Sequence, residues 1–447
     1  MSNYKTPPQV KGDFLLGNLR EFKADAFQAL CRWQRDYGDI VSFKLARQQF
    51  YLFNHPKLVE QALIKQSDTF VKMYDAKKPK GLAIILGQGL VTSQGDLWRK
   101  QRRLMQPVFQ RSNLASMLPQ MSTAGSNMLS RWESLAEGAQ VNLADEMMQL
   151  TLEVITQTMF STSVLGEIEK IAPALDTGLR YAAKTIANPL TLPLIFPTPA
   201  NQEFKRARDL LDTVIYDIIE QRRAETEAPN DLLSMLLNVN DTDTHTKMSD
   251  QQIRDEVLTI FSAGHETTAN LLTWTLYLLA KNPAVLAKLR AELEGLAGKI
   301  PDETDLQQLV YTRAVLNESM RIRPPVGLIM RKVKQDTTIE GYALKANSLV
   351  VFSIYNLHHH AEFWDKPEVF DPERFLSNEK RRFSYMPFGT GERVCIGNHF
   401  ALMEGQLLLS MIVQSYDMQL LESGEVEIEM AVTLRPKGGV PVQLKRR

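Results

Sequence analysis

Cysteine is scarce in this chain: Cys31 and Cys395 are the two cysteines among 447 residues. They form no CxxC pair and are too few for a disulfide framework, so we expect a reduced, intracellular protein. An excess of one charge is also missing, because Lys+Arg and Asp+Glu both number 52. A chain with balanced charge has no overall attraction to nucleic acid or to an acidic membrane surface. Charged partners must therefore be recognised by local patches.

A long apolar run is absent from residues 1–22, where the short apolar stretch lies among charged residues. This pattern argues against a signal peptide and against a membrane anchor. We therefore expect a cytoplasmic protein, and a monomer.

Internal repeats, low-complexity segments and Gly- or Ser-rich linkers are likewise absent. Length alone suggests two or three domains, but without a linker we expect a single domain over residues 1–447. Apolar residues at helical spacing prevail between residues 56 and 297. Short segments rich in β-branched and aromatic residues predict strands near 39–54, 333–357 and 425–445. The predicted class is mainly α with a small β region.

Four prolines interrupt the helical pattern between residues 187 and 201. Proline among apolar residues predicts a loop between two helices. Two interpretations stay open for this segment: a mobile apolar lid, or a buried connector.

Residues 251–282 predict a long helix with an acidic first turn and one broad apolar stripe. Gly264 and Thr267 interrupt the stripe. Because a glycine inside a helix costs about 1 kcal/mol, Gly264 indicates either room for a bound group or a close helix crossing. Thr267 and Glu266 could deliver protons to a bound group, or the threonine could bond back to its own helix. Glu266 falls off the stripe, so a relay through it would need local distortion or water.

Glu318 and Arg321 lie three residues apart and would be neighbours on one face of a helix. Arg374 follows in a proline-bounded turn between aromatic residues. Arginine suits two-pronged pairing with a carboxylate when it is partly buried. The alternative for Glu318 and Arg321 is an ordinary solvated surface pair.

Cys395 stands among Gly389, Gly391 and Gly397, directly before a predicted helix. The N–H groups and dipole of a helix start stabilise an anion, which favours a thiolate at this position. Arg393 could contact an acidic part of whatever group the sulfur holds. An inert, buried cysteine is the alternative interpretation.

A zinc site built from Cys395, His399 and the run His358–His360 is disfavoured. Adjacent histidines rarely face one metal ion, and the chain has no spaced Cys/His quartet.

Four motifs make the chain resemble the cytochrome P450 family, the haem-thiolate monooxygenases, over residues 36–441. The F-x-x-G-x-R-x-C-x-G pattern is complete at 388–397 and is highly specific, whereas E-x-x-R alone is weak. The other motifs are W-x-x-x-R at Trp98 and Arg102, A-G-x-E-T-T at 263–268, and E-x-x-R at Glu318 and Arg321 followed by P-E-R-F with Arg374. Their conjunction in this order implies the cytochrome P450 fold.

The resemblance implies a role for each motif residue. Cys395 would be the thiolate ligand of the haem iron, where its electron donation favours O–O cleavage. Thr267 with Glu266 would be catalytic and would deliver protons during dioxygen activation. Glu318, Arg321 and Arg374 would form a buried structural triad. The expected haem-binding residues are Trp98, Arg102, Gly264, Thr268, Arg331, Phe388, Arg393 and Gly397.

The same likeness places an apolar pocket above the haem, which suits a hydrophobic substrate. Its expected lining is Met73, Tyr74, Val91, Ile260, Ala263, Val326, Leu328, Ile329 and Val432. No arginine in these segments is an obvious carboxylate clamp, although Lys72 or Arg47 could serve. We expect hydroxylation or epoxidation of a fatty acid, with a terpenoid, carotenoid or steroid as the alternative substrate.

The resemblance also implies the cofactor and partners. We expect haem b, with electrons from NAD(P)H delivered through a separate ferredoxin or flavodoxin and its reductase. The basic segments 98–103 and 379–383 are candidate docking surfaces for an acidic protein, or they are solvated faces. A peroxygenase or haem-dependent isomerase, and a non-catalytic haem sensor or binding protein, are the alternatives to a monooxygenase.

Overall fold

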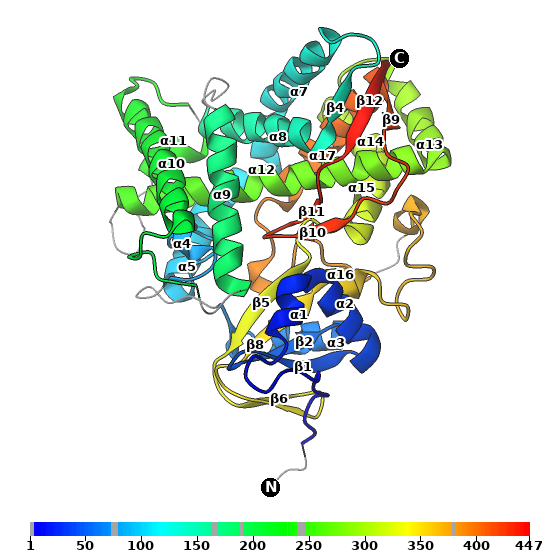
Figure 1. Ribbon diagram of the computed structural model, residues 1–447. Coiled ribbons are helices and arrows are strands. Elements are labelled where there is room, and N and C mark those ends of the chain that lie inside the picture. The colour runs from blue at the N-terminus through cyan, green and yellow to red at the C-terminus, as the bar shows by residue number, and fades with distance from the viewer. Residues whose placement is uncertain are drawn as a thin grey trace.

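Helices form the larger part of the structure, and the principal sheet lies at one end of it (Figure 1). The computed structural model describes residues 4–72, 79–161, 168–187, 191–229, 231–238, 247–377 and 381–447. The predicted class, mainly α with a small β region, is confirmed.

The helices fall into a long and a short group. The long ones are α2 (Ala26–Tyr37), α5 (Gly95–Met105), α7 (Leu118–Glu133), α8 (Leu143–Phe160), α9 (Ile168–Ala187), α10 (Pro199–Ala224), α12 (Asp250–Lys281), α13 (Pro283–Leu293), α15 (Val310–Ile322) and α17 (Asn398–Ser415). The short ones are α1 (Leu19–Ala24), α3 (Pro56–Glu60), α4 (Ala83–Leu86), α6 (Arg111–Ala115), α11 (Leu232–Asn238), α14 (Glu303–Gln308) and α16 (Ile354–His358).

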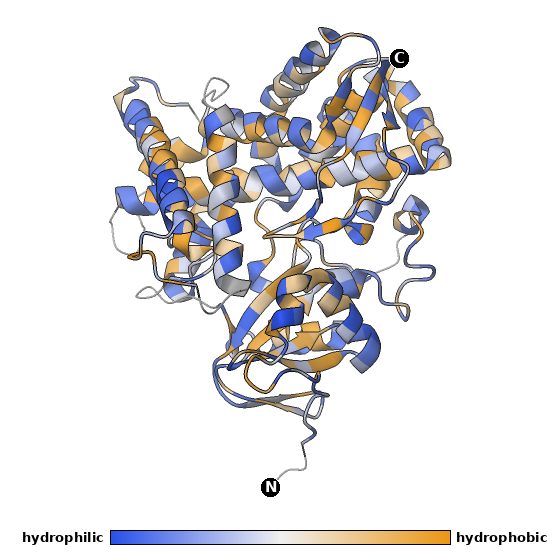
Figure 2. Ribbon diagram, viewed as in Figure 1, coloured by the Kyte–Doolittle hydropathy of each residue, from blue (hydrophilic) through white to orange (hydrophobic). Residues whose placement is uncertain are grey.

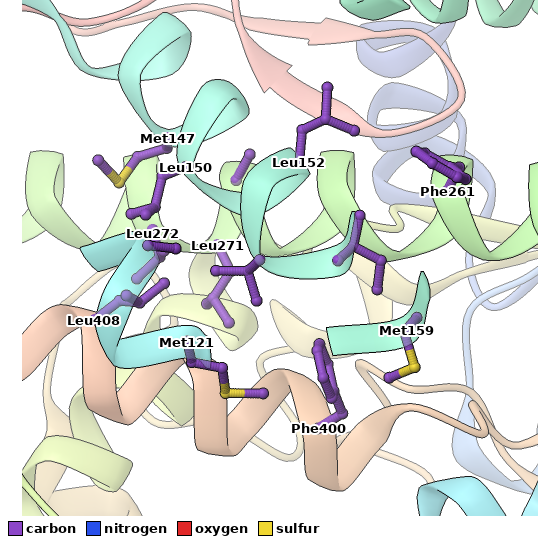
Figure 3. Close-up of a cluster of buried hydrophobic side chains, with 14 of the residues drawn as sticks. Met121, Met147, Leu150, Leu152, Met159, Phe261, Leu271, Leu272, Phe400 and Leu408 are labelled. Carbon is purple, nitrogen blue, oxygen red and sulfur yellow. The ribbon is translucent and has the colours of Figure 1, made fainter. Parts of the chain in front are cut away.

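Helix α12 crosses the middle of the helical part (Figure 1). The Ser249 hydroxyl caps its first turn by accepting from the N–H of Gln252, and Asp250 follows there, where the helix dipole favours a negative charge. The helix is buried along nearly its whole length. Figure 3 shows the apolar cluster in which Leu271 and Leu272 of α12 lie near side chains from α7, α8 and α17. This packing holds α12 and α17 together, and both helices line the cavity described below.

The largest sheet has the strand order β1-β2-β8-β5-β3, and both of its faces are covered. Alternate residues of β2 belong to different clusters: Leu52 packs with Trp33 of α2, whereas Phe53 packs with α3. Its central strand β8 is buried at every position. The strands are β1 (Ile40–Leu45), β2 (Gln48–Phe53), β3 (Phe70–Val71), β5 (Leu328–Val333) and β8 (Leu349–Ser353).

The smaller sheets come mostly from the C-terminal third of the chain. They are the pair β6 (Thr337–Ile339) with β7 (Tyr342–Leu344), the hairpin β10 (Ile428–Met430) with β11 (Leu434–Pro436), and the sheet of β4 (Gln140–Asn142), β12 (Pro441–Arg446) and β9 (Tyr416–Leu420). Strands thus occur in all three ranges expected from the sequence. The strand β5 begins five residues earlier than the expected 333–357 range.

In the proline-rich turn before α10, Leu192, Ile195 and Phe196 are exposed, Ile195 to 80%, whereas Leu194 packs against the main apolar cluster. Asn201 of α10 donates to the carbonyls of Pro193 and Phe196, both at 2.9 Å, and so holds the turn against the helix. The buried-connector interpretation is therefore wrong for Leu192, Ile195 and Phe196. Figure 2 shows the contrast between the mixed hydropathy of the outer helix α10 and the largely hydrophobic strands of the main sheet. No helix in the described part of the chain is long and apolar enough to cross a membrane.

Candidate active site

A cavity opens between α12, α5 and α17, with residues 325–331 and 387–397 completing its wall. It encloses about 1540 Å³ of unfilled space, its open mouth included. Most of the lining side chains are apolar, and the charged ones are confined to Lys72 and three arginines. Cys395 lies on this wall, and the exposed surface of its side chain faces the cavity.

The backbone around Cys395 is arranged to present the sulfur. The N–H of Cys395 donates to the carbonyl of Phe388 at 2.9 Å, which closes the turn. Helix α17 follows with Gly397 as its cap, and no side chain caps its first turn. Burial raises the pKa of the Cys395 thiol, although a hydrogen bond from the Gly397 N–H and the charge of Arg102 act to lower it. A metal cation at the sulfur would add the positive charge that makes the thiolate the stable form.

Two contacts from outside hold the cysteine turn in place. Gly391 has a φ of +71°, and a Cβ there would lie 2.9 Å from the carbonyl oxygen of Leu63, so only glycine fits. The Nε2 atom of His358 accepts from the N–H of Met386 at 2.9 Å. Burial lowers the pKa of His358 to about 3, so its ring stays neutral and remains an acceptor. Of the histidine run, His358 therefore supports the turn.

Four cations converge on one rim of the cavity: Lys72, Arg102, Arg331 and Arg393. Burial first, and then repulsion by Arg331 and Arg393, lowers the pKa of Lys72 to about 7. Burial likewise lowers the pKa values of Arg331 and Arg393 to about 10. Within the described residues, none of the four forms an ion pair with a carboxylate. Arg331 is buried and the other three cations are half-buried, and Glu392 acts on Arg331 and Arg393 through its charge without an ion pair. Because charges withdrawn from water are normally paired, this rim suits a ligand with more than one negative charge.

The donor set therefore fits haem. The thiol of Cys395 offers a soft ligand for iron, the cationic rim suits the two propionates, and the apolar walls suit the porphyrin face. The expected haem-binding residues Trp98, Arg102, Gly264, Thr268, Arg331, Phe388, Arg393 and Gly397 all line the cavity.

The polar positions on α12 differ in where they point. Thr267 lines the cavity, and its Oγ1 donates to the carbonyl of Ala263 at 2.7 Å. Gly264 also lines the cavity, yet a Cβ there would lie 2.6 Å from Cδ1 of Ile155, so the crossing of α8 requires this glycine as well. Thr268 also lines the cavity. Glu404 of α17 is a buried carboxyl whose pKa burial raises well above its usual value.

Glu266 does not lie on the cavity wall. It is buried on another face of α12, where its Oε1 accepts a hydrogen bond of 2.6 Å from the hydroxyl of Thr433. Glu266 was expected beside the bound group, but it does not lie there, because it falls outside the stripe of α12 that faces the cavity.

The expected substrate-pocket residues divide into three groups. Val91, Ile260, Ala263, Val326 and Ile329 line the cavity.

Two others do not line the cavity. Leu328 points to the opposite face of β5 from Ile329, because side chains alternate along a strand, and Val432 stands in the turn between β10 and β11. Met73 and Tyr74 lie outside the described residues.

The structure brings the expected triad together. Arg321 donates through Nε and Nη2 to both oxygens of Glu318, at 2.7 and 2.8 Å, and both side chains are fully buried. The Nε of Arg374 lies 3.4 Å from Oε1 of Glu318. Burial raises the pKa of Glu318, although the hydrogen bond and charge of Arg321 act to lower it. The surface-pair interpretation is wrong, since no water reaches this pair.

Several lining residues were not anticipated. Thr259 and Leu271 continue the four-residue spacing of Ala263 and Thr267 along α12, so the pattern could have indicated them. Ile155 comes from α8, and no local pattern signals that contact. Lys72 was considered as a substrate clamp, but it lies beside Arg331 and Arg393 at the cationic rim.

Comparison with known proteins agrees with this geometry. The family model described as cytochrome P450 matches residues 7–441. Cyclooctatin synthase of Streptomyces melanosporofaciens is 34% identical, over 91% of this chain and 89% of that protein. Cyclooctat-9-en-7-ol 5-monooxygenase of the same organism is 33% identical, over 85% and 82%. Pentalenene oxygenase of Streptomyces avermitilis is 31% identical, over 90% and 89%. The chain belongs to the cytochrome P450 family, and it is a monooxygenase.

Proposed function

We propose that this monooxygenase hydroxylates or epoxidises a terpenoid. The relatives carry this proposal, because the names of three of them refer to cyclooctatin, cyclooctat-9-en-7-ol and pentalenene, which are terpenoids. The largely apolar cavity supports it, since a terpenoid needs few polar anchors. The carotenoid and steroid alternatives share this chemistry.

A fatty acid, the first expectation from the sequence, becomes the second candidate. It requires a cation placed to hold a carboxylate at a distance from the haem. Lys72 belongs to the same rim as Arg331 and Arg393, which suits it to a propionate. Arg47 is exposed in the turn between β1 and β2, which does not line the cavity.

The residues around the cavity would have different roles in haem binding and catalysis. Haem, when bound, supplies the activation of dioxygen. Cys395 would bind the iron through sulfur, with the N–H of Gly397 stabilising the negative charge. Lys72, Arg102, Arg331 and Arg393 would orient the propionates. Thr267 would hold a proton at Oγ1 on the cavity wall, and the apolar residues would exclude water.

A spectral titration tests the substrate class. We expect farnesol and geranylgeraniol to shift the haem Soret band to saturation, and lauric and palmitic acids to leave it unchanged. Saturable shifts with the fatty acids alone would overturn the terpenoid proposal. The reduced enzyme with carbon monoxide should show the red-shifted thiolate band, and Cys395→Ser should abolish it. A normal band in that variant would contradict the role of Cys395.

We further propose that a ferredoxin or flavodoxin delivers electrons from NAD(P)H at the outer face of α5. Trp98 and Arg102 line both the cavity and a surface hollow that also includes Arg99 and Arg103. A cationic hollow so close to the haem site suits an acidic partner.

Charge reversal at Lys100 and Arg103 tests this docking surface. It should slow reduction by an acidic ferredoxin and weaken its salt dependence. Unchanged kinetics would contradict it. In the second basic segment Arg381 stacks on Trp364 at 4.5 Å, and residues 378–380 lie outside the described ranges.

A further inference from the structure

Three buried side chains, one turn apart on α12, hold the C-terminal hairpin. They are Glu266, Asn270 and Trp274, each exposed to 4% or less. Their spacing of four residues puts them on one face of the helix. The hydroxyl of Thr433 donates to Glu266 at 2.6 Å and accepts from Nδ2 of Asn270 at 3.0 Å. The indole N–H of Trp274 donates to the carbonyl of Leu434 at 3.1 Å.

The Thr433 hydroxyl links Glu266 and Asn270, because it donates one hydrogen bond and accepts the other. It is 3% exposed, so water does not compete for either bond. A serine at position 433 could make both hydrogen bonds. Valine has nearly the same shape as threonine but could make neither hydrogen bond. It would leave the Glu266 oxygen and the Asn270 amide each without this partner.

Leu434, the residue after Thr433, contacts the segment that forms the cavity wall. Its N–H donates to the carbonyl of Pro325 at 2.8 Å. Its side chain fills the space beside Gly327, where a Cβ would lie 2.5 Å from Cδ1 of Leu434. Pro325, Val326 and Ile329 face the cavity, whereas Val432 and Leu434 do not. The hairpin turn thus supports the wall from behind.

The two strands of the hairpin are themselves joined by an ion pair. Arg435 pairs with Glu429, which is its partner across the strands, at 2.9 Å. Arg435 also pairs with Asp176 of α9 at 2.7 Å. Because the hairpin is held as one body, a shift at Thr433 is carried to Leu434.

We propose that Thr433, held by Glu266 and Asn270, is a specificity-determining positioning residue that sets the place of the cavity wall at 325–329. Glu266 acts in this unit as a hydrogen-bond acceptor for Thr433. The inference rests on the proposed function only in that the cavity receives the substrate.

Hydrogen–deuterium exchange of the substrate-free holoenzyme tests the positioning directly. Thr433→Val should raise exchange rates about tenfold or more in peptides covering 323–333 and 428–436. Thr433→Ser, which keeps both bonds, should match the wild type. Lys437→Ala, which removes an exposed pair with Glu427 on the same hairpin, is the matched control. Unchanged exchange at 323–333 in Thr433→Val would overturn the proposal.

The dimensions of the cavity give a second readout. The affinities for 1-phenylimidazole and 4-phenylimidazole, measured from the haem spectrum, should change in ratio by about fivefold or more in Thr433→Val and stay unchanged in Thr433→Ser. Glu266→Gln keeps an acceptor oxygen and should preserve the ratio, whereas Glu266→Leu should alter it. If Glu266→Gln behaved like Glu266→Leu, the acceptor role would be wrong.

Loss of fold would not leave the question open. If Thr433→Val does not fold, Asn270→Ala is the second variant. It removes only the hydrogen bond from Asn270 to Thr433 and should raise exchange in the same two peptides. Failure of the terpenoid titration would leave the exchange result standing, since no substrate is present.

Discussion

The guanidinium carbon of Arg393 lies 3.9 Å from the centre of the Trp98 indole ring. The same guanidinium donates through Nη1 to the carbonyl of Ser93 at 3.0 Å. A cation stacked on tryptophan contributes about 0.5–2 kcal/mol. The stack joins α5 to the cysteine turn, so contacts within the protein itself organise the cavity rim to which we assign the haem propionates.

Removing one rim cation should weaken haem binding. Charge-assisted hydrogen bonds are worth about 1.5–3 kcal/mol, so Lys72→Met or Arg331→Leu should speed haem loss roughly tenfold to a hundredfold. Transfer of haem to apomyoglobin measures this rate. Lys332→Met is the control, since Lys332 is the next residue on β5 and does not line the cavity. Equal rates in all three variants would argue against the propionate assignment.

Thr267→Ala should keep haem bound and uncouple electron use from product formation, because it removes from the cavity wall the hydroxyl that we propose as the proton donor. Peroxide released per NAD(P)H consumed measures the uncoupling, and we expect a rise of several fold. Thr273 makes the same bond to its own helix, 2.7 Å to the carbonyl of Ala269, but it does not line the cavity. Thr273→Ala should therefore stay coupled. Similar peroxide yields from both variants would show that Thr267 has no special role.

Glu318→Gln should destabilise the fold strongly, because it leaves the buried charge of Arg321 without its carboxylate. Breaking a buried pair costs about 3–5 kcal/mol, to be measured as the free energy of unfolding in urea. Glu373, exposed and paired with Lys288, is the matched control. Its replacement by Gln should cost about 1 kcal/mol or less. A small effect at Glu318 would mean that the triad contributes little stability.

Stability should fall with rising pH because of Glu256 of α12. This buried carboxyl accepts from the N–H of Leu90 at 2.9 Å, and burial raises its pKa to about 8. In the unfolded chain a glutamate has a pKa of about 4.3. Between these values the folded state binds more protons, so the free energy of unfolding decreases as pH rises from about 5 to 8.

Glu256→Gln, neutral at every pH, should flatten this dependence, as measured by the melting temperature at pH 5.5 and pH 8. Glu203→Gln, at an exposed position on α10, should leave it unchanged. A Glu256→Gln variant with the wild-type slope would place the titrating group elsewhere.

The sequence alone indicated the class, the family resemblance and about half of the residues that line the cavity. The class follows from local hydrophobic periodicity, whereas the cavity residues follow from the family resemblance, which rests on short motifs such as those around Cys395 and at Glu318 and Arg321. A spacing between residues that are close in sequence can be recognised without knowing the tertiary structure.

Tertiary structure alone decided where the remaining side chains act. Glu266 meets Thr433, a partner 167 residues away in sequence, and Leu328 and Val432 do not line the cavity, although both were expected there. Lys72 joins Arg331 and Arg393 at one rim although the three are far apart along the chain. These outcomes depend on which face of an element points inward and on which distant segment packs against it. Helical spacing already placed Glu266 off the stripe, but its partner Thr433 is set by long-range packing, which no local spacing of residues encodes.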